Sequence, residues 1–345
     1  MTPKRRPRVL SAVQPTAMLH IGNYFGAISN WVRLLRDNEC FYAVAVYHAL
    51  TLPCPPEQLR RNTEEMLLDL VACGVDPGEC VLFRQSDVPE HFELMWILSC
   101  LAPFAELARM PQFKEKSAAL SRNSSDGGTA GLACYPLLQA ADILAYNADL
   151  VPVGRDQLQH LELTRELARR FNERYGDFLT KPEPLLSETP KIRSLANPTA
   201  KMSKSLGARH YVGLFEPEAS VRDKVRRAVT DGGIRPEGGE MSPGVANLLE
   251  ILRACGQAAE ADALAADYGR EALSYATLKE TVADALAGLT ATLRAGRAEA
   301  EASRAEILLA VRRNGERARE VARTTLNELR ERIGIMTDVE VGHAA

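Results

Sequence analysis

The sequence lacks several features that mark specialised classes of protein. None of its apolar runs reaches the about 18 residues that a membrane-spanning helix needs. Its seven cysteines are scattered, and no two of them stand in a Cys-x-x-Cys spacing. This odd, dispersed set argues against a zinc site and favours reduced thiols in the cytoplasm. The basic N-terminus is not followed by the apolar segment of a signal peptide, so we expect no export signal.

The chain also lacks a strong charge of either sign. Its net charge is −3, so any contact with nucleic acid would have to come from local basic patches. With 345 residues, 46% hydrophobic and 25% charged, the composition is that of a globular protein with room for two domains. We find no internal repeat.

The first 90 residues alternate between short apolar segments and amphipathic ones. We expect strands over 8–13, 40–46 and 81–85, and helices from Ala27 and over 57–72. This alternation predicts an α/β fold with a doubly wound, Rossmann-like parallel sheet. In such a sheet, ligands bind beyond the carboxyl ends of the strands, where Gln14, His20 and His48 follow.

The rest of the chain is expected to become increasingly helical. The expected elements are a helical stretch over 89–110, a polar loop over 117–131, a helix from Tyr135 with Pro136 in its first turn, a strand over 150–153, a helix over 158–175 and an irregular segment over 181–198. Beyond 207 we expect helices over 216–229 and 245–255, and helical periodicity from 268 to about 333. We therefore expect an α/β domain over 1–206, with a helical insertion over about 89–150, and an α-helical domain over 207–345.

Two segments have the residues of a phosphate site. Lys201-Met202-Ser203-Lys204-Ser205 offers two ammonium groups and two hydroxyls to phosphate oxygens, although most such segments are solvated surface loops. In the segment from His20, Gly22 lets backbone approach a ligand at a helix N-terminus, and His20 and Asn23 can donate hydrogen bonds. The alternative for this segment is an ordinary strand-to-helix turn.

Together these segments resemble the two signatures of the class I aminoacyl-tRNA synthetases. Lys201–Ser205 matches the second signature letter for letter, and His20-Ile21-Gly22-Asn23 resembles the first. The context from Gln14-Pro15-Thr16 to Ala27 is similar to the tryptophanyl branch of the tryptophanyl/tyrosyl subgroup. Ala12 and Ala17 stand where that branch more often has glycine.

A third segment bears on the substrate. Tyr135, Gln139, Asp142 and Tyr146 fall at i, i+4, i+7 and i+11, on one polar face of an otherwise apolar helix. A buried carboxylate needs a partner, and for Asp142 an internal arginine or a helix cap is one candidate. The other is a ligand with a polar hydrogen, such as the donor-only N–H of an indole.

The resemblance assigns the indole nitrogen of tryptophan to Asp142. Gln139 stands where bacterial tryptophanyl enzymes usually have Met, and the Gln139–Asp142 segment also resembles the tyrosyl family. Two other segments, 110–117 and 151–157, favour tryptophan over tyrosine, although Arg155 replaces a glutamate in the second of them.

The resemblance implies further site residues. Those expected to bind ATP are Gln14, Pro15, Thr16, His20, Gly22, Asn23, Gly154, Arg155, Asp156, Ile192, Lys201, Met202, Ser203, Lys204 and Ser205. Those expected to bind the amino acid are Asp142, Gln139, Tyr135, Gln157, His48, Gln112, Val151 and Val153. Lys201, Lys204, His20, Asn23 and Lys116 are the expected catalytic residues. The resemblance implies that Mg²⁺ enters with ATP and that the protein itself binds no metal.

Some residues depart from the family or have no match in it. Val46 replaces an aspartate next to His48, whereas His91, His160 and His210 match nothing and are interpreted as structural or surface histidines. The cluster Arg222, Lys224, Arg226 and Arg227 is either a solvated helix face or an RNA contact.

The resemblance implies an activity: ATP-dependent formation of tryptophanyl-adenylate and transfer to tRNA(Trp). It further implies a cytoplasmic homodimer joined through about 89–150, with a helical domain that meets the anticodon. Two alternatives stay open. One is a tyrosine-activating synthetase. The other, suggested by Gln139, Val46 and Arg155, is a specialised or regulatory paralogue that binds tryptophan or RNA, including an inhibitor-resistant second synthetase.

Overall fold

A five-stranded, all-parallel sheet lies at the centre of the computed structural model, which describes residues 5–15, 18–108, 129–154, 157–186, 190–231 and 240–335. The strands are β1 (Arg8–Val13), β2 (Glu39–Val44), β3 (Val81–Arg84), β4 (Leu150–Val153) and β5 (Glu183–Leu186), in the order β3-β2-β1-β4-β5. The sheet extends from β1 in both directions, through β2 on one side and β4 on the other. The expected doubly wound α/β fold is confirmed.

Helices cover both faces of the sheet, because side chains along a strand alternate between the faces. Val9, Tyr42 and Leu82 belong to the core on one face, which is covered by α1 (Ile21–Asn23), η1 (Tyr24–Ile28), α2 (Ser29–Leu34) and α4 (Pro56–Ala72). Leu10, Phe41 and Phe83 belong to the core on the other face, with α5 (Glu90–Ser99), α8 (Ala130–Leu144) and α9 (Leu158–Tyr175). Each face therefore has its own apolar core.

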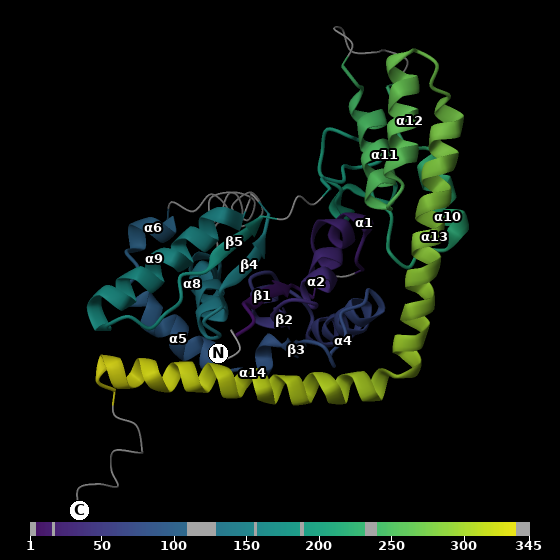
Figure 1. The fold of residues 1–345 in the computed structure, drawn as a ribbon. Helices are drawn as coiled ribbons and strands as arrows, with labels where there is room; N and C mark the ends of the chain where they lie inside the picture. The colour runs from purple at the N-terminus through teal and green to yellow at the C-terminus, as the bar shows by residue number, and fades with distance from the viewer. Residues whose placement is uncertain are drawn as a thin grey trace, which may run out of the picture.

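The part of the chain after residue 207 is helical, as expected. Its elements are η5 (Ala208–His210), α10 (Glu218–Arg226), α11 (Pro243–Ala254), α12 (Ala258–Gly269), α13 (Tyr275–Ala302) and α14 (Arg304–Ile333). In Figure 1, α11, α12 and α13 stand upright beside the α/β part, and α14 runs back beneath β3 and α5. The domain boundary at 206/207 stays a prediction.

Several local expectations were wrong. Helical structure begins at Ile21, ahead of the expected Ala27, and Val46 opens α3 (Val46–Ala49) instead of closing a strand. The helix expected from Tyr135 begins at Ala130, where the Thr129 hydroxyl accepts a hydrogen bond from Leu132 N–H at 3.3 Å. Pro136 therefore lies inside a helix.

The segment over 181–198 also differs from expectation, because it contains β5. This strand includes Pro184, and it lies at the edge of the sheet. Proline is tolerated there because an edge strand pairs along one side only. A residue without an N–H can then face the side of the strand that has no neighbour.

None of the described helices is long and apolar enough to cross a membrane. All seven cysteines lie in the described part of the chain, and none is in a disulfide.

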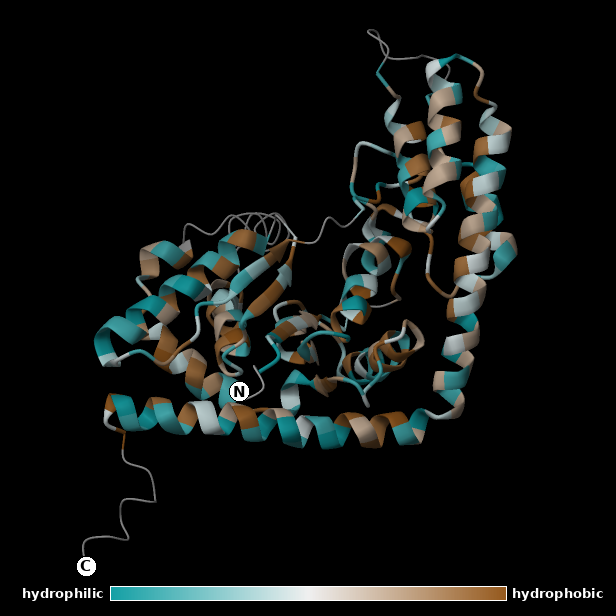
Figure 2. Cartoon of the chain, in the orientation of Figure 1, coloured by the Kyte–Doolittle hydropathy of each residue, from teal (hydrophilic) through white to brown (hydrophobic). Residues whose placement is uncertain are grey.

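The last helix, α14, ties the end of the helical part to the sheet. Its buried apolar residues recur at helical spacing: Ile307, Val311, Ala318, Ala322, Leu326 and Leu329. Figure 2 shows the resulting mixture of apolar and polar patches along it. Within this contact, the buried Asn314 amide donates to the carbonyl oxygens of Pro77 at 2.9 Å and Cys80 at 3.1 Å. Asn314 thereby fixes α14 against the start of β3.

We expect Asn314→Ala to lower the free energy of unfolding by about 1–3 kcal/mol, because two carbonyl groups lose their donor. The neighbouring exposed Arg313 provides a matched control, and Arg313→Ala should change stability by less than about 0.5 kcal/mol. Chemical denaturation measures both variants. Equal stability of the two would show that Asn314 does not fix α14.

Candidate active site

The predicted site residues gather at the carboxyl edge of the sheet. Gln14 follows β1, His48 lies in α3 just after β2, and Gly154 follows β4. Gln85 opens η2 (Gln85–Asp87) directly after β3. The carboxyl ends of parallel strands meet at one edge, so these residues converge although they are far apart in the sequence.

Asp142 of α8 is buried, with 6% of its surface exposed, and side chains from three other elements surround its carboxylate. His48 Nε2 lies 2.8 Å from Oδ2. Gln85 Nε2 donates to both oxygens, at 2.8 and 2.9 Å. His91 Nδ1 of α5 lies 3.0 Å from Oδ1. The partners of Asp142 are thus two histidines and a glutamine, and not the arginine or helix cap considered from the sequence.

This arrangement determines the charge of Asp142. Burial raises the pKa of the carboxyl, but hydrogen bonds and charge interactions with His48 and His91 outweigh burial and hold the pKa well below its ordinary value. The group is therefore ionised at neutral pH, and an ionised carboxylate only accepts hydrogen bonds. A ligand atom facing Asp142 must be a donor.

Other predicted residues for the amino acid lie nearby. The Tyr135 hydroxyl is 2.8 Å from His160 Nε2, and the rings of Tyr135 and His48 are 6.3 Å apart. Val151 and Val153 are buried in β4. Gln139 and Gln157 are half-buried, and no side-chain contact places either against Asp142.

Sequence reasoning missed Gln85 and assigned no role in the site to His91 or His160. Both histidines are buried, each with 1% of its surface exposed, so a surface location is wrong for them. The polar run Gln85-Ser86-Asp87, at the end of the strand expected over 81–85, was the only local signal for Gln85.

The predicted phosphate-binding segments also lie together. His20 N–H donates to Asn23 Oδ1 at 3.2 Å, and the Lys204 ammonium donates to Met18 O at 2.7 Å. A Cβ atom at Gly22 would lie 3.0 Å from the His20 ring and 3.5 Å from Met202 Cβ, so residue 22 has little room for a side chain. The two signatures therefore meet across Gly22.

Within the second signature, Met202 is buried and Lys201 is exposed. The hydroxyls of Ser203 and Ser205 are 2.8 Å apart, at the start of η4 (Lys204–Leu206). The buried methionine anchors a segment whose polar groups reach the surface.

The charge at this end of the site comes from the lysines. Burial, followed by the nearby charges of Lys204 and Lys201, lowers the pKa of His20 from 6.5 to about 4. Partial burial also lowers the pKa of Lys204. His20 is consequently neutral at pH 7, and the positive charge belongs to the two lysines.

The expected adenine contact, Ile192, is buried and accepts a backbone hydrogen bond from Met202 N–H at 3.4 Å. Gln14 is half-buried and Pro15 is buried. Five predicted residues lie outside the described part of the chain: Thr16, Gln112, Lys116, Arg155 and Asp156. Among the described residues, no three His, Cys, Asp or Glu side chains are grouped to hold a metal ion.

The basic cluster on α10 is paired with acidic side chains. Arg222 bonds Glu218 at 2.7 Å and Asp284 at 2.6 Å, and Lys224 pairs with Glu216. Arg226 and Arg227 both contact Asp223. These pairs favour the solvated-face interpretation over an RNA contact.

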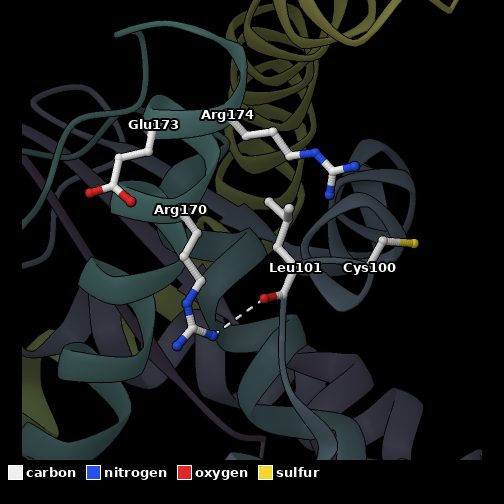
Figure 3. Close-up of a pocket in the computed structure, with 5 residues that line it drawn as sticks. All are labelled: Cys100, Leu101, Arg170, Glu173 and Arg174. Carbon is white, nitrogen blue, oxygen red and sulfur yellow. Dashed lines mark hydrogen bonds between the residues drawn. The ribbon is translucent and has the colours of Figure 1, made fainter.

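A surface hollow of about 340 Å³ lies away from the predicted site. Figure 3 shows its lining, Cys100, Leu101, Arg170, Glu173 and Arg174, where α5 ends and along the second half of α9. The Arg170 guanidinium is engaged by Leu101 O at 3.3 Å and by Glu106 at 2.7 Å. None of the predicted site residues lines this hollow.

Known proteins resemble the chain over almost its whole length. The profile of the family "tRNA synthetases class I (W and Y)" matches residues 2–290. "Tryptophan--tRNA ligase 2" of Streptomyces avermitilis is 42% identical over 337 residues, which is 96% of this chain and 98% of that protein.

Solved structures agree with this result. Tryptophanyl-tRNA synthetase from Mycoplasma pneumoniae superposes with a TM-score of 0.85 at 33% identity, over 96% of this chain and 98% of that one. The Campylobacter jejuni enzyme, complexed with ADP and tryptophan, gives a TM-score of 0.78 at 30% identity, over 95% and 99% of the two chains.

The lowered pKa of His20 predicts a pH dependence of stability. As pH falls below 6.5, the unfolded chain binds a proton at this histidine, whereas the folded chain stays neutral there until about pH 4. Between pH 7 and 5, wild-type protein should therefore lose about 2 kcal/mol more stability than His20→Gln, which cannot titrate at this position. Parallel losses in the two proteins, measured by denaturation at both pH values, would contradict the shift.

Proposed function

Because the chain belongs to the class I transfer-RNA synthetases for tryptophan and tyrosine, we propose that it activates L-tryptophan with ATP and transfers it to tRNA(Trp). It is an aminoacyl-tRNA ligase. The observation that carries the choice of amino acid is the buried, ionised Asp142, which accepts hydrogen bonds and can receive the indole N–H.

The proposed amino-acid pocket surrounds Asp142. The indole ring lies against Tyr135, Gln139, Val151 and Val153, and its N–H donates to the Asp142 carboxylate. His48 lies at the same carboxylate, 2.8 Å away. Gln112 and Gln157 bind the polar end of the amino acid. This arrangement keeps the carboxylate of tryptophan free to react.

In the proposed reaction, that carboxylate attacks the α-phosphorus of ATP. A bond forms between carboxylate oxygen and phosphorus, and the bond from phosphorus to the bridging oxygen breaks as pyrophosphate leaves. Lys201 and Lys204 stabilise the charge that develops on pyrophosphate, and His20, Asn23 and Lys116 donate from the other side. Mg²⁺ carried by ATP neutralises further phosphate charge.

The remaining ATP contacts hold the nucleoside. Gln14, Pro15, Thr16 and Gly22 border the phosphates, and Ile192 meets adenine. Gly154, Arg155 and Asp156 lie at the ribose, while Met202, Ser203 and Ser205 complete the closing segment. A hydroxyl of the terminal tRNA ribose then attacks the adenylate carbonyl and AMP leaves. Catalysis is thus positioning and charge stabilisation, and no side chain forms a covalent intermediate.

Amino-acid-dependent exchange of labelled pyrophosphate into ATP tests this function. We expect exchange with tryptophan and little with tyrosine, and charging of tRNA(Trp) by the same enzyme. Exchange only with tyrosine would support the sister activity. Tryptophan binding without exchange would support a regulatory paralogue, and resistance to an indole-containing inhibitor would mark a specialised second synthetase.

In the same assay, Lys201→Ala and Lys204→Ala should each lower kcat about 100-fold or more, because each removes charge stabilisation made chiefly in the transition state. The KM for tryptophan should change little. The exposed Lys181 serves as control, and Lys181→Ala should match wild type. Equal losses in kcat and tryptophan binding would contradict the leaving-group role.

We also propose that the protein is a homodimer joined through α5 and α6 (Phe104–Ala108). Phe92, Trp96 and Phe104 are 42%, 71% and 78% exposed, which makes an unusually apolar surface at these helices. Leu50 and Leu52 add further exposed apolar area.

The mass in solution tests the dimer. We expect about twice the 37.8 kDa of one chain, and we expect Trp96→Glu to yield monomers, because it places a charge in the contact. Leu309→Glu, at an exposed apolar position on α14, should remain dimeric. A monomeric wild-type protein would exclude the proposal.

The tRNA contact of the helical domain and the cytoplasmic location are proposed with the function.

A further inference from the structure

Two side chains beside Asp142 have no part in the proposed reaction so far. Gln85 and His91 are each 1% exposed and lie on different elements, η2 and α5. Both contact the Asp142 carboxylate, and each has a second hydrogen-bond partner behind it. These second partners indicate which nitrogen of each side chain carries the hydrogen that faces Asp142.

The first chain of hydrogen bonds passes through Gln85. Tyr47 N–H donates to Gln85 Oε1 at 3.0 Å, so the oxygen of the amide faces the backbone. The amide nitrogen must then face Asp142, and it lies 2.8 and 2.9 Å from the two carboxylate oxygens. A reversed amide would place its oxygen against the carboxylate and its nitrogen against another donor.

The second chain passes through His91. Its buried Nδ1 lies 3.0 Å from Asp142 Oδ1 in a close contact without hydrogen-bond geometry, and an unprotonated nitrogen would place a lone pair beside that anionic oxygen. Nδ1 therefore carries the hydrogen. In the neutral ring Nε2 is then an acceptor, and it receives the Tyr146 O–H at 2.9 Å. Tyr146 is fully buried and packed against Phe41 and Phe83, with ring centroids 4.8 and 5.7 Å away.

Both chains end at the carboxylate, to which Gln85 donates directly and beside which His91 Nδ1 lies 3.0 Å from Oδ1. We propose that Gln85 and His91, with Tyr146 behind His91, are positioning residues that hold Asp142 as a fixed, ionised acceptor for a donor group of the amino acid. This inference rests on the proposed function. With Asp142 held in this way, the pocket accepts a ligand that presents an indole N–H. It rejects a ligand whose ring edge has no donor, because the buried carboxylate would lose its only ligand contact.

Steady-state exchange kinetics of the full-length enzyme test the proposal. His91→Leu removes the polar hydrogen beside the buried carboxylate and should raise the KM for tryptophan about 10- to 100-fold, the scale on which a charged group responds to losing a polar partner. The KM for ATP and the kcat at saturating tryptophan should stay within about threefold of wild type. His91→Asn can place an amide N–H near the position of Nδ1, and it should restore the tryptophan KM to within about threefold of wild type.

The tautomer of His91 gives a readout that does not depend on these variants folding. In long-range ¹H–¹⁵N spectra of histidine-labelled wild type, His91 should show a protonated Nδ1 and an unprotonated Nε2. Tyr146→Phe removes the donor to Nε2 and should shift the ring toward a mixture of tautomers. A protonated Nε2 in neutral, wild-type His91 would overturn the proposal.

The kinetic outcomes separate this inference from the proposed function. Absence of tryptophan-dependent exchange in wild type would overturn the function itself. An active wild type with an unchanged tryptophan KM in His91→Leu would overturn only the positioning role. An equal rise in the KM values for tryptophan and ATP would also overturn the positioning role. Failure of His91→Asn to restore the tryptophan KM would do the same, since each result indicates general damage to the fold.

Discussion

The interaction on which the site depends is the burial of one carboxylate. A buried, ionised carboxylate without partners is so unfavourable that it would take up a proton. Asp142 avoids this because His48, Gln85 and His91 surround it from α3, η2 and α5. Those elements must therefore converge on α8, and the parallel sheet makes that possible, since two of them follow directly from the carboxyl ends of neighbouring strands.

This dependence explains which parts of the site could be predicted from the sequence. Asp142 was identifiable because a charged residue on an apolar helix signals a special role. Its partners were not, because Gln85 and His48 are 57 and 94 residues away along the chain. Periodicity within a helix shows which face is buried, but it does not show what that face meets. His91 therefore remained an unassigned structural or surface histidine in the sequence, and its contact with Asp142 was not predictable.

The fold follows the same division between local and distant effects. β1 and α9 have the bounds expected from their apolar patterns, because burial on the sheet determines both. Pro136 and Pro184 misled the local reasoning. At Pro136, the Thr129 cap and the apolar packing of α8 outweigh the one hydrogen bond that proline removes. At Pro184, only the position of β5 at the edge of the sheet makes the strand possible, and that position is a property of the whole topology.

The contacts on either side of Lys201–Ser205 limit what this segment can do. Before it, the Asn247 side chain of α11 bonds both N–H and C=O of Arg193, at 2.7 and 3.1 Å. After it, Ile21 N–H donates to Val212 O and Leu214 N–H donates to Leu19 O, each at 3.0 Å. The segment is thus held at both ends, with the buried Met202 as an anchor within it. The proposed rearrangement around a polyphosphate is then confined mainly to the half-buried to exposed stretch from Ser203 to Arg209, which includes Gly207 at φ +105°. Because Asn247 belongs to the helical part and His20 to the α/β part, a shift of one part against the other would change the distance between the two proposed phosphate-binding segments.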